Sequence, residues 1–579
     1  MKTKPLAAIV TALLASYLPV SNAGAPAATA DLVLLNGKVL TVDANDTVAE
    51  AVAIRGERIL AVGSSQEIAA MAGPRARRVD LRGRTVTPGL IDTHAHLTLG
   101  SLRDVYQVDV SYPNAESMAD VARLIGERVA RAQPGEWITG SGWDEGKLAE
   151  KRYIYASDID AASPNNPVML MQTTNHYVTA NSAALRAAGI TRDTPDPPGG
   201  TIDRDENGEP TGVLKERAMG LVSSLIPSYT AQQIYDAAAT LAQVAATECL
   251  TAIKDPGIGQ SQWDNYQRLR SDGKLPLRVA VLWRTPRDLD EAQALIERIK
   301  PISRPGVPTI DDHIVSVGIK IGLDGSGGAR TAWMHEDWSR EFINTDTGNS
   351  GYPVFDLGLV GQLVRMYHDA GLHLGIHAIG DKAIDWTIDA YEALLKENPI
   401  QGTRHSLIHG NTPSDGSIAK MAVMQRKYDA AYPEAQAPFM WWIGDTYAGN
   451  LGPMRALRLK PLKTFMEHGV IWAGGSDYPV TPLPPRYGLW SSLARETLLG
   501  VYGQTPFGTA DAVTINTALR SYTDWASRML FMEKQIGTIE PGKYADLAIW
   551  DKDVYAAPVA ELKDMKCSMT VFNGRVVHE

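Results

Sequence analysis

The segment Pro88-Gly-Leu-Ile-Asp92-Thr-His94-Ala-His96 places two histidines two positions apart at the end of a short apolar run. Alternate side chains of an extended strand share one face, so both imidazoles can reach the same metal ion. An H-x-H pair alone is a weak signal, because core and surface histidines produce it by chance. Its significance depends on what the rest of the chain places at comparable points.

Four further residues that can bind a metal or a proton stand where a predicted strand meets a turn: Lys320, His377, His409 and Asp477. The separation of His377 and His409 fits one strand–helix unit, and that of His409 and Asp477 fits two. If His377 ends strand 5, the others end strands 4, 6 and 8, with the histidine pair after strand 1. In a barrel these ends form the face where catalytic residues collect.

The middle of the chain, residues 86–534, alternates strand and helix patterns. Apolar runs at 250–254, 277–282, 314–321, 372–377, 406–409 and 470–473 predict strands, and residues 230–247, 290–300 and 357–370 predict helices. Such alternation indicates parallel βαβ units, in a doubly wound sheet or a (β/α)8 barrel. Residues 105–220 break the rhythm and predict an insertion after barrel strand 1, with a hairpin over 199–212.

Both ends of the chain predict β structure. Asn36-Gly37 and Asn573-Gly574 each separate two apolar runs, which is a strong hairpin signal, and a further hairpin is expected over 51–62 around Gly56-Glu57. We therefore expect residues 24–85 and 535–579 to form one composite β-sandwich. Two unrelated β caps are the alternative.

Residues 1–23 have the layout of a secretory signal peptide. Lys2 and Lys4 precede an apolar run over 6–20, and Ser21-Asn22-Ala23 matches an A-x-A-like cleavage site. The run is shorter than the roughly 20 residues that span a bilayer. The sequence predicts a periplasmic or secreted protein without membrane insertion.

Composition narrows the candidate partners. The chain has 56 Lys and Arg against 66 Asp and Glu, a formal net charge of −10, so nucleic acid is not expected as a partner. The only two cysteines, Cys249 and Cys567, are too far apart to predict a disulfide framework or a thiolate zinc site. A single bridge between them is left open but is not expected.

At this point the sequence resembles a known group, the amidohydrolase superfamily, and within it amidohydrolase family 3, the branch of N-substituted formamide deformylases. The matching stretches are PGLIDTHAH (88–96), GSGWDE (140–145), NHYVTANSAAL (175–185), KIGLDGSGGARTA (320–332), HAIGD (377–381), AGGSDYPV (473–480) and IGTIEPGKYADLAIWD (536–551). The resemblance implies a metal-dependent hydrolase on a (β/α)8 barrel with a composite β-sandwich. It also implies the metal ligands His94, His96, Lys320, His377, His409 and Asp477.

The resemblance leaves the metal centre partly open. Lys320 would be N-carboxylated and would bridge two divalent ions in a binuclear site, whereas a mononuclear site would need it only as an ion-paired lysine. Zinc is the preferred ion because imidazoles suit it, with iron, manganese and nickel left open. Ile408, Gly410, Gly327 and Ala329 depart from the family pattern and put the substrate, rather than the mechanism, in question.

The expected reaction is hydrolysis of a non-peptide C–N bond, in an amide or N-substituted formamide of small-molecule size. Asp477 is the predicted catalytic residue, because a carboxylate can take a proton from the attacking water and pass it to the leaving amine. Trp143, Asp144, His176 and Arg330 are the candidate substrate contacts. A lactonase, esterase or carbamate hydrolase with the same metal site, and a non-catalytic binding protein, remain as alternatives; a homodimer is also considered.

Overall fold

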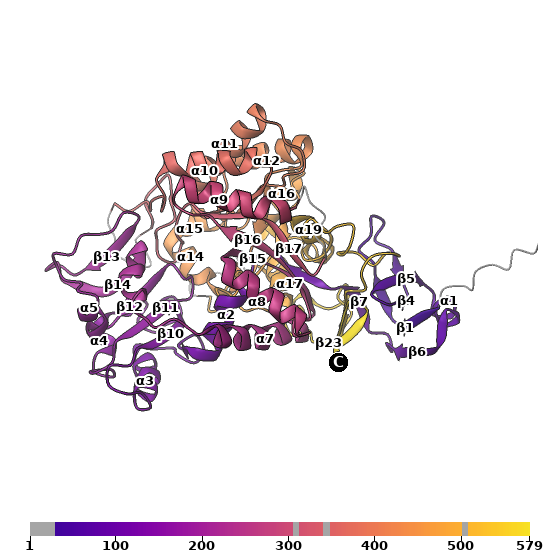
Figure 1. Ribbon diagram of the computed structural model, residues 1–579, viewed down its shortest axis with the longest axis horizontal. Coiled ribbons are helices and arrows are strands. Elements are labelled where there is room, and N and C mark those ends of the chain that lie inside the picture. Colours follow the sequence, from indigo (N-terminus) through magenta and orange to yellow (C-terminus); the bar gives the residue numbers. More distant parts are fainter. Residues whose placement is uncertain (1–28, 305–311, 340–347, 501–507) are drawn as a thin grey trace, which may run out of the picture.

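An eight-stranded parallel sheet closed into a barrel forms the centre of the molecule (Figure 1). The structure is a computed structural model, which describes residues 29–304, 312–339, 348–500 and 508–579. The barrel strands, in spatial order, are β8 (Leu90–Asp92), β15 (Leu250–Ile258), β16 (Arg278–Arg284), β17 (Ile314–Gly322), β18 (His373–Ala378), β19 (Ser406–His409), β20 (Tyr432–Ala435) and β21 (Ala473–Gly474). Thr93 N donates to Gly474 O at 3.0 Å and closes the ring between the last and first strands.

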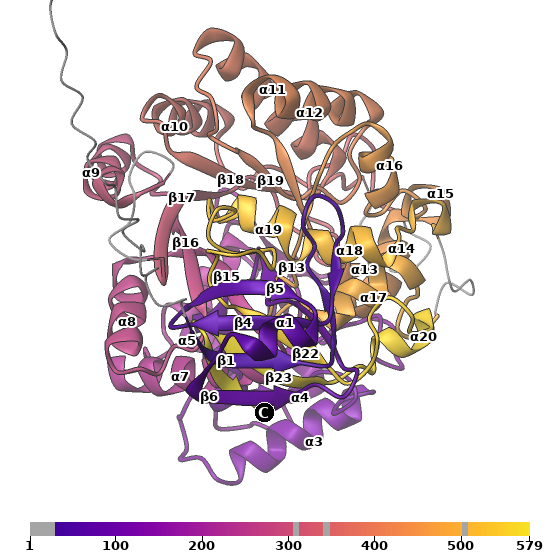
Figure 2. The same ribbon diagram turned by 90° about the vertical axis from the view of Figure 1, so that its right-hand side faces the viewer.

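The strands are buried on both faces, and alternate residues divide between two cores. Ala280, Leu282 and Val317 point into the barrel, whereas Val279 and Val281 pack against the surrounding helices. Those helices include α7 (Ala231–Thr247), α8 (Gln260–Ser271), α9 (Leu289–Ile299), α10 (Leu357–Asp369), α11 (Asp381–Glu397) and α12 (Asp415–Tyr428) (Figure 2). The barrel predicted from the sequence is confirmed, and its strand order brings the carboxyl ends of strands 1, 4, 5, 6 and 8 to one rim.

Two further sheets from the chain ends pack together beside the barrel, at the right of Figure 1. The four-stranded sheet has the order β5-β4-β1-β6, from β5 (Arg58–Gly63), β4 (Ala51–Arg55), β1 (Ala30–Leu35) and β6 (Ala72–Asp80). The six-stranded sheet has the order β24-β23-β22-β7-β2-β3, from β24 (Arg575–His578), β23 (Cys567–Phe572), β22 (Leu547–Trp550), β7 (Thr85–Pro88), β2 (Lys38–Leu40) and β3 (Val48–Ala49). The amino- and carboxyl-terminal segments therefore share one sheet.

One of the predicted hairpins is wrong. β1 and β2, on either side of Asn36-Gly37, lie in different sheets and do not pair. A tight type I′ turn needs positive φ at both central residues, and here Asn36 alone has it, at 57°. At Asn573-Gly574 both residues are left-handed, at 48° and 70°, and β23 pairs with β24.

The expectation of unpaired cysteines is also wrong, because Cys249 and Cys567 form a disulfide across 318 residues. Cys249 lies between α7 and β15, and Cys567 begins β23. The bond therefore joins the barrel to the β-sandwich. The sequence does not show the pairing, because only the tertiary structure brings these two distant segments together.

The segment after barrel strand 1 forms a sheet of its own, at the left of Figure 1. Its order is β13-β14-β12-β11-β10-β9, from β13 (Gly200–Arg204), β14 (Pro210–Glu216), β12 (Tyr177–Ala180), β11 (Val168–Gln172), β10 (Ile138–Trp143) and β9 (Val108–Asp109). It has a separate apolar core that includes Ile125, Trp143 and Tyr177. Across the described ranges of the chain, no helix is both long and apolar enough to cross a bilayer.

Candidate metal centre

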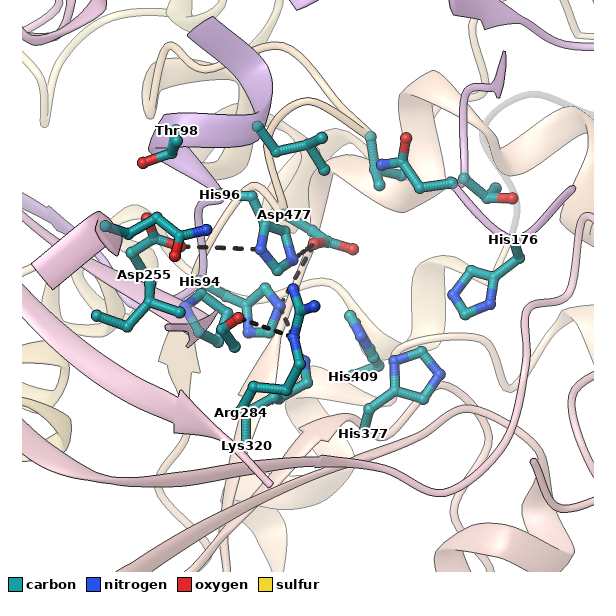
Figure 3. A pocket seen from close by; sticks show the side chains of 18 of the residues that line it. His94, His96, Thr98, His176, Asp255, Arg284, Lys320, His377, His409 and Asp477 are labelled. Carbon is teal, nitrogen blue, oxygen red and sulfur yellow. Dashed lines mark hydrogen bonds and ion pairs between the residues drawn. The ribbon is translucent and has the colours of Figure 1, made fainter. Parts of the chain in front are cut away.

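All six predicted metal ligands line one cavity of about 330 Å³ at the carboxyl end of the barrel (Figure 3). His94 and His96 follow β8, Lys320 lies near the end of β17, His377 lies in β18, His409 ends β19, and Asp477 follows β21. His409 and Asp477 have φ values of 76° and 58°. Backbone strain of this kind in non-glycine residues is often found at functional sites.

The tightest cluster consists of His94, His96 and Asp477. The Nε2 atoms of both histidines lie 3.4 Å from Asp477 Oδ1, and one ligand atom from each residue lies within 4.8 Å of the other two. Burial acts to raise the pKa of Asp477, but the two histidines hold it well below its usual value. This carboxyl group is therefore ionised, as a metal ligand or proton acceptor must be.

His377 and His409 extend the cluster on its other side. Their ring centroids are 4.5 Å apart, and that of His409 lies 5.2 Å from that of His94. Burial lowers the pKa of His377 and of His409 well below the usual value. Both rings are therefore neutral at physiological pH, which is the form that binds metals.

Each histidine directs one ring nitrogen at a protein acceptor. His377 Nε2 donates to Gly325 O at 3.0 Å, and His409 Nδ1 donates to Gln436 Oε1 at 2.9 Å. Lys460 also donates to Gln436 Oε1, which identifies that atom as the oxygen. The other ring nitrogen of each histidine is therefore unprotonated and keeps its lone pair for a metal ion. Hydrogen bonds to such acceptors orient metal-binding histidines in the same way.

Buried acids face the Nδ1 atoms of the H-x-H pair at distances longer than a hydrogen bond. Glu434 Oε2 lies 3.9 Å from His94 Nδ1, and neither atom has a hydrogen-bond partner among the described residues. The other carboxylate oxygen of Glu434 pairs with Lys254, and both side chains are fully buried. Asp255 Oδ1 lies 3.8 Å from His96 Nδ1. The Nε2 atoms of both histidines face Asp477.

Lys320 is set in the same cavity, with Nζ 3.4 Å from His94 Nε2. Burial lowers its pKa to about 8, helped by Lys254 and Arg284 and opposed by Asp477 and Glu434. A substantial neutral fraction at physiological pH is what reaction with CO₂ requires. The donor set of four imidazoles, one ionised carboxylate and this amine fits one or two divalent ions.

Of the four candidate substrate contacts, His176 alone lines the cavity. Its Nδ1 lies 3.0 Å from both carboxylate oxygens of Glu216, and its ring centroid lies 5.2 Å from that of His377. Burial acts to lower the pKa of His176, but Glu216 outweighs it and the pKa is raised. The pair comes from the ends of β12 and β14, so the insertion supplies one wall of the site.

The other three candidates lie away from the cavity. Trp143 is fully buried in the core of the insertion, where its N–H donates to Leu170 O. Asp144 accepts a hydrogen bond from Thr446 Oγ1 at 2.5 Å. Arg330 is fully buried in the loop after β17.

Three residues that the sequence reasoning did not assign to the site line or support it: Asp255, Arg284 and Glu434. Arg284 and Asp255 line the cavity, and Glu434 lies behind His94. Each stands at or near the carboxyl end of a barrel strand, as the predicted ligands do. Their position near the strand ends is the one sequence signal that could have assigned them to the site. It is a weak signal, because arginine and acidic residues are common at strand ends for other reasons.

Comparison with known proteins agrees with this geometry. A protein-family model described as "Amidohydrolase family" matches residues 77–578. The chain is 29% identical to the putative amidohydrolase YtcJ of Bacillus subtilis, over 92% of this chain and 96% of that protein. It is also 29% identical to the N-substituted formamide deformylase of Arthrobacter pascens, over 95% and 98%.

Solved structures share the fold. An uncharacterized metal-dependent hydrolase from Pyrococcus horikoshii superposes with a TM-score of 0.69 at 22% identity, over 91% of this chain and 99% of that one. Atrazine chlorohydrolase TrzN from Arthrobacter aurescens, solved with zinc, gives 0.52 at 15% identity, over 95% of both chains. The match to the family model extends over most of the chain and confirms the resemblance inferred from its motifs: the chain belongs to the amidohydrolase family and is a metal-dependent hydrolase.

Proposed function

We propose that this protein is an exported, metal-dependent amidohydrolase that cleaves a non-peptide C–N bond in an amide or N-substituted formamide. The observation that carries the proposal is the convergence of His94, His96 and Asp477 beside Lys320, His377 and His409 in one cavity. The similarity to a deformylase of N-substituted formamides along nearly the whole chain supports the substrate class. Zinc is the ion we propose, because the donors are mainly imidazoles.

The chemistry that such an ion supplies when bound is polarisation of the carbonyl and a lowering of the pKa of bound water to about 7. The chain's own residues then handle binding and protons. Asp477, ionised and in contact with both histidines, accepts the proton of the attacking water and returns it to the leaving amine. His176, held by Glu216 at the opposite wall, contacts the substrate beside the scissile bond.

Apolar side chains suit the cavity to a hydrophobic substituent. Leu99, Leu102, Ile258 and Val480 line it together with the polar groups already named. A cavity of about 330 Å³ lies at the lower end of the usual range for small-molecule sites. The proposed substrate is therefore a small amide rather than a polymer.

Export is supported by two independent features. The first is the signal-like segment over residues 1–23, which lies outside the described residues. The second is the disulfide between Cys249 and Cys567, since disulfides persist in oxidising compartments such as the periplasm.

The test is turnover of a matched amide and ester that share the same acyl group and a leaving group of the same shape. N-benzylformamide and benzyl formate form such a pair, and the zinc-loaded mature protein is the enzyme. For each compound, kcat/KM is divided by its uncatalysed rate of hydrolysis. We expect this rate enhancement to be at least ten-fold higher for the amide than for the ester. A preference for the ester would replace the proposal with an esterase, and binding without turnover of either would favour a non-catalytic protein.

A further inference from the structure

Arg284 places a positively charged side chain in the lining of the cavity of the metal centre. It is the last residue of β16, pairs in register with Lys320 of the neighbouring strand, and lines the cavity with the predicted ligands (Figure 3). It is solvent-exposed, so no burial cost forces it to find a protein partner. No motif of the sequence and no step of the proposed reaction uses it.

The guanidinium of Arg284 is oriented by a single contact. Its Nε donates to the carbonyl oxygen of Gly257 at 3.1 Å. Gly257 has φ at +83°, a left-handed conformation in the turn after Lys254 and Asp255. With Nε engaged there, the two Nη groups form a fork that can accept a ligand carboxylate through two parallel hydrogen bonds.

Within the described ranges, no carboxylate lies within 4 Å of this fork, although two acids line the same cavity. Asp477 contacts His94 and His96, and Asp255 accepts a hydrogen bond from Tyr266 and faces His96. Both acids are thus engaged on the side of the cavity where the histidine pair lies. The two Nη groups of Arg284 remain available to a ligand.

We propose that Arg284 forms a subsite for a carboxylate group of the substrate, so that the preferred amides carry an anionic group near the scissile bond as well as an apolar substituent. The apolar wall of Leu99, Leu102 and Ile258 takes the substituent, and the fork of Arg284 binds the carboxylate through two parallel hydrogen bonds. This inference rests on the proposed function and specifies its substrate class. It predicts a higher kcat/KM for N-formylated or N-acylated amino acids than for neutral amides of equal size.

The test uses two compounds that differ only in the carboxylate: N-formylphenylalanine and N-formyl-2-phenylethylamine. The zinc-loaded mature protein should hydrolyse the first with about ten-fold higher kcat/KM, the range expected for a charge-assisted bidentate contact. In Arg284→Gln this ratio should fall to about one, mainly through KM. Arg298→Gln is the matched control, because Arg298 stacks on Trp283 and does not line the cavity, and it should leave the ratio at ten.

Binding separates failure of this inference from failure of the proposed function. Calorimetry with N-formylphenylalanine should give about ten-fold weaker binding to Arg284→Gln than to the wild-type protein. If neither compound is hydrolysed but this difference is present, the proposed reaction fails and the subsite stands. Equal binding by both proteins, or a wild-type preference for the neutral compound, would overturn the subsite.

Discussion

Variants of the buried ion pair between Lys254 and Glu434, next to His94, should affect stability and metal affinity in different ways. Both side chains are fully buried, and the free oxygen of Glu434 faces His94 Nδ1. Glu434→Leu leaves the Lys254 ammonium buried without a counter-charge, and Lys254→Met leaves the Glu434 carboxylate buried without one. Breaking such a pair from one side costs about 3–5 kcal/mol.

For a domain of several hundred residues the entropy of unfolding is on the order of 1 kcal/mol/K, so each single variant should lower the thermal midpoint by about 3–5 °C. The double variant Lys254→Met/Glu434→Leu removes both charges and should recover most of that loss. Scanning calorimetry of the metal-free proteins measures these midpoints. A double variant that loses the sum of the two single effects would refute the pairing.

Metal affinity should follow a different pattern in the same three proteins. Removal of a group that orients a metal-binding histidine typically costs 10- to 100-fold in affinity. We therefore expect this loss in Glu434→Leu and in the double variant, and a much smaller change in Lys254→Met. Competition with a chromophoric zinc chelator measures it. Equal affinities in all four proteins would show that Glu434 has no role in positioning His94.

Three further predictions follow from other parts of the molecule. Asp477→Asn should retain its fold and bind at least one metal ion but lose about 10²–10⁴-fold in kcat, and wild-type turnover by this variant would exclude the proton-transfer role. Cys249→Ala/Cys567→Ala should lose about 2–5 kcal/mol of stability, and reductant should lower the thermal midpoint of the wild-type protein but not that of the variant. Burial raises the pKa of Glu145 from 4.5 to about 8, so between these pH values the folded state keeps a proton on this group that the unfolded state has released. The contribution of Glu145 to stability therefore falls as pH rises through this window. The urea midpoint should decrease less from pH 5 to pH 8 in Glu145→Gln than in the wild-type protein.

The barrel and the positions of its candidate ligands could be predicted from the sequence for a physical reason. Parallel strands end at one rim, so residues such as Lys320, His377 and His409, each at or near the end of an apolar run, come together whatever the helices between them. Their spacing predicted three consecutive strands, numbered 4, 5 and 6 if His377 ends strand 5, and the sheet order β17-β18-β19 agrees. A local sequence pattern is sufficient to predict these positions, because the parallel topology of the barrel brings the strand ends together.

Features that depend on contacts between distant segments could not be predicted in this way. Trp143 and Asp144 stand in a motif shared with the family, but only tertiary packing shows that they lie inside the insertion and away from the cavity. The disulfide joins segments 318 residues apart. Arg284 could not be singled out from the sequence, because the sequence does not show whether a charged side chain at a strand end has a partner.

The most direct test of the metal centre is the number of metal ions per chain, by elemental analysis of the mature protein and of His94→Asn/His96→Asn, both purified without chelator and dialysed against zinc. We expect one or two tightly held ions per wild-type chain, fewer in the variant, and amide turnover that disappears on chelation and returns with zinc. A wild-type protein that holds no metal ion, or that hydrolyses its substrate equally well without one, would contradict this expectation.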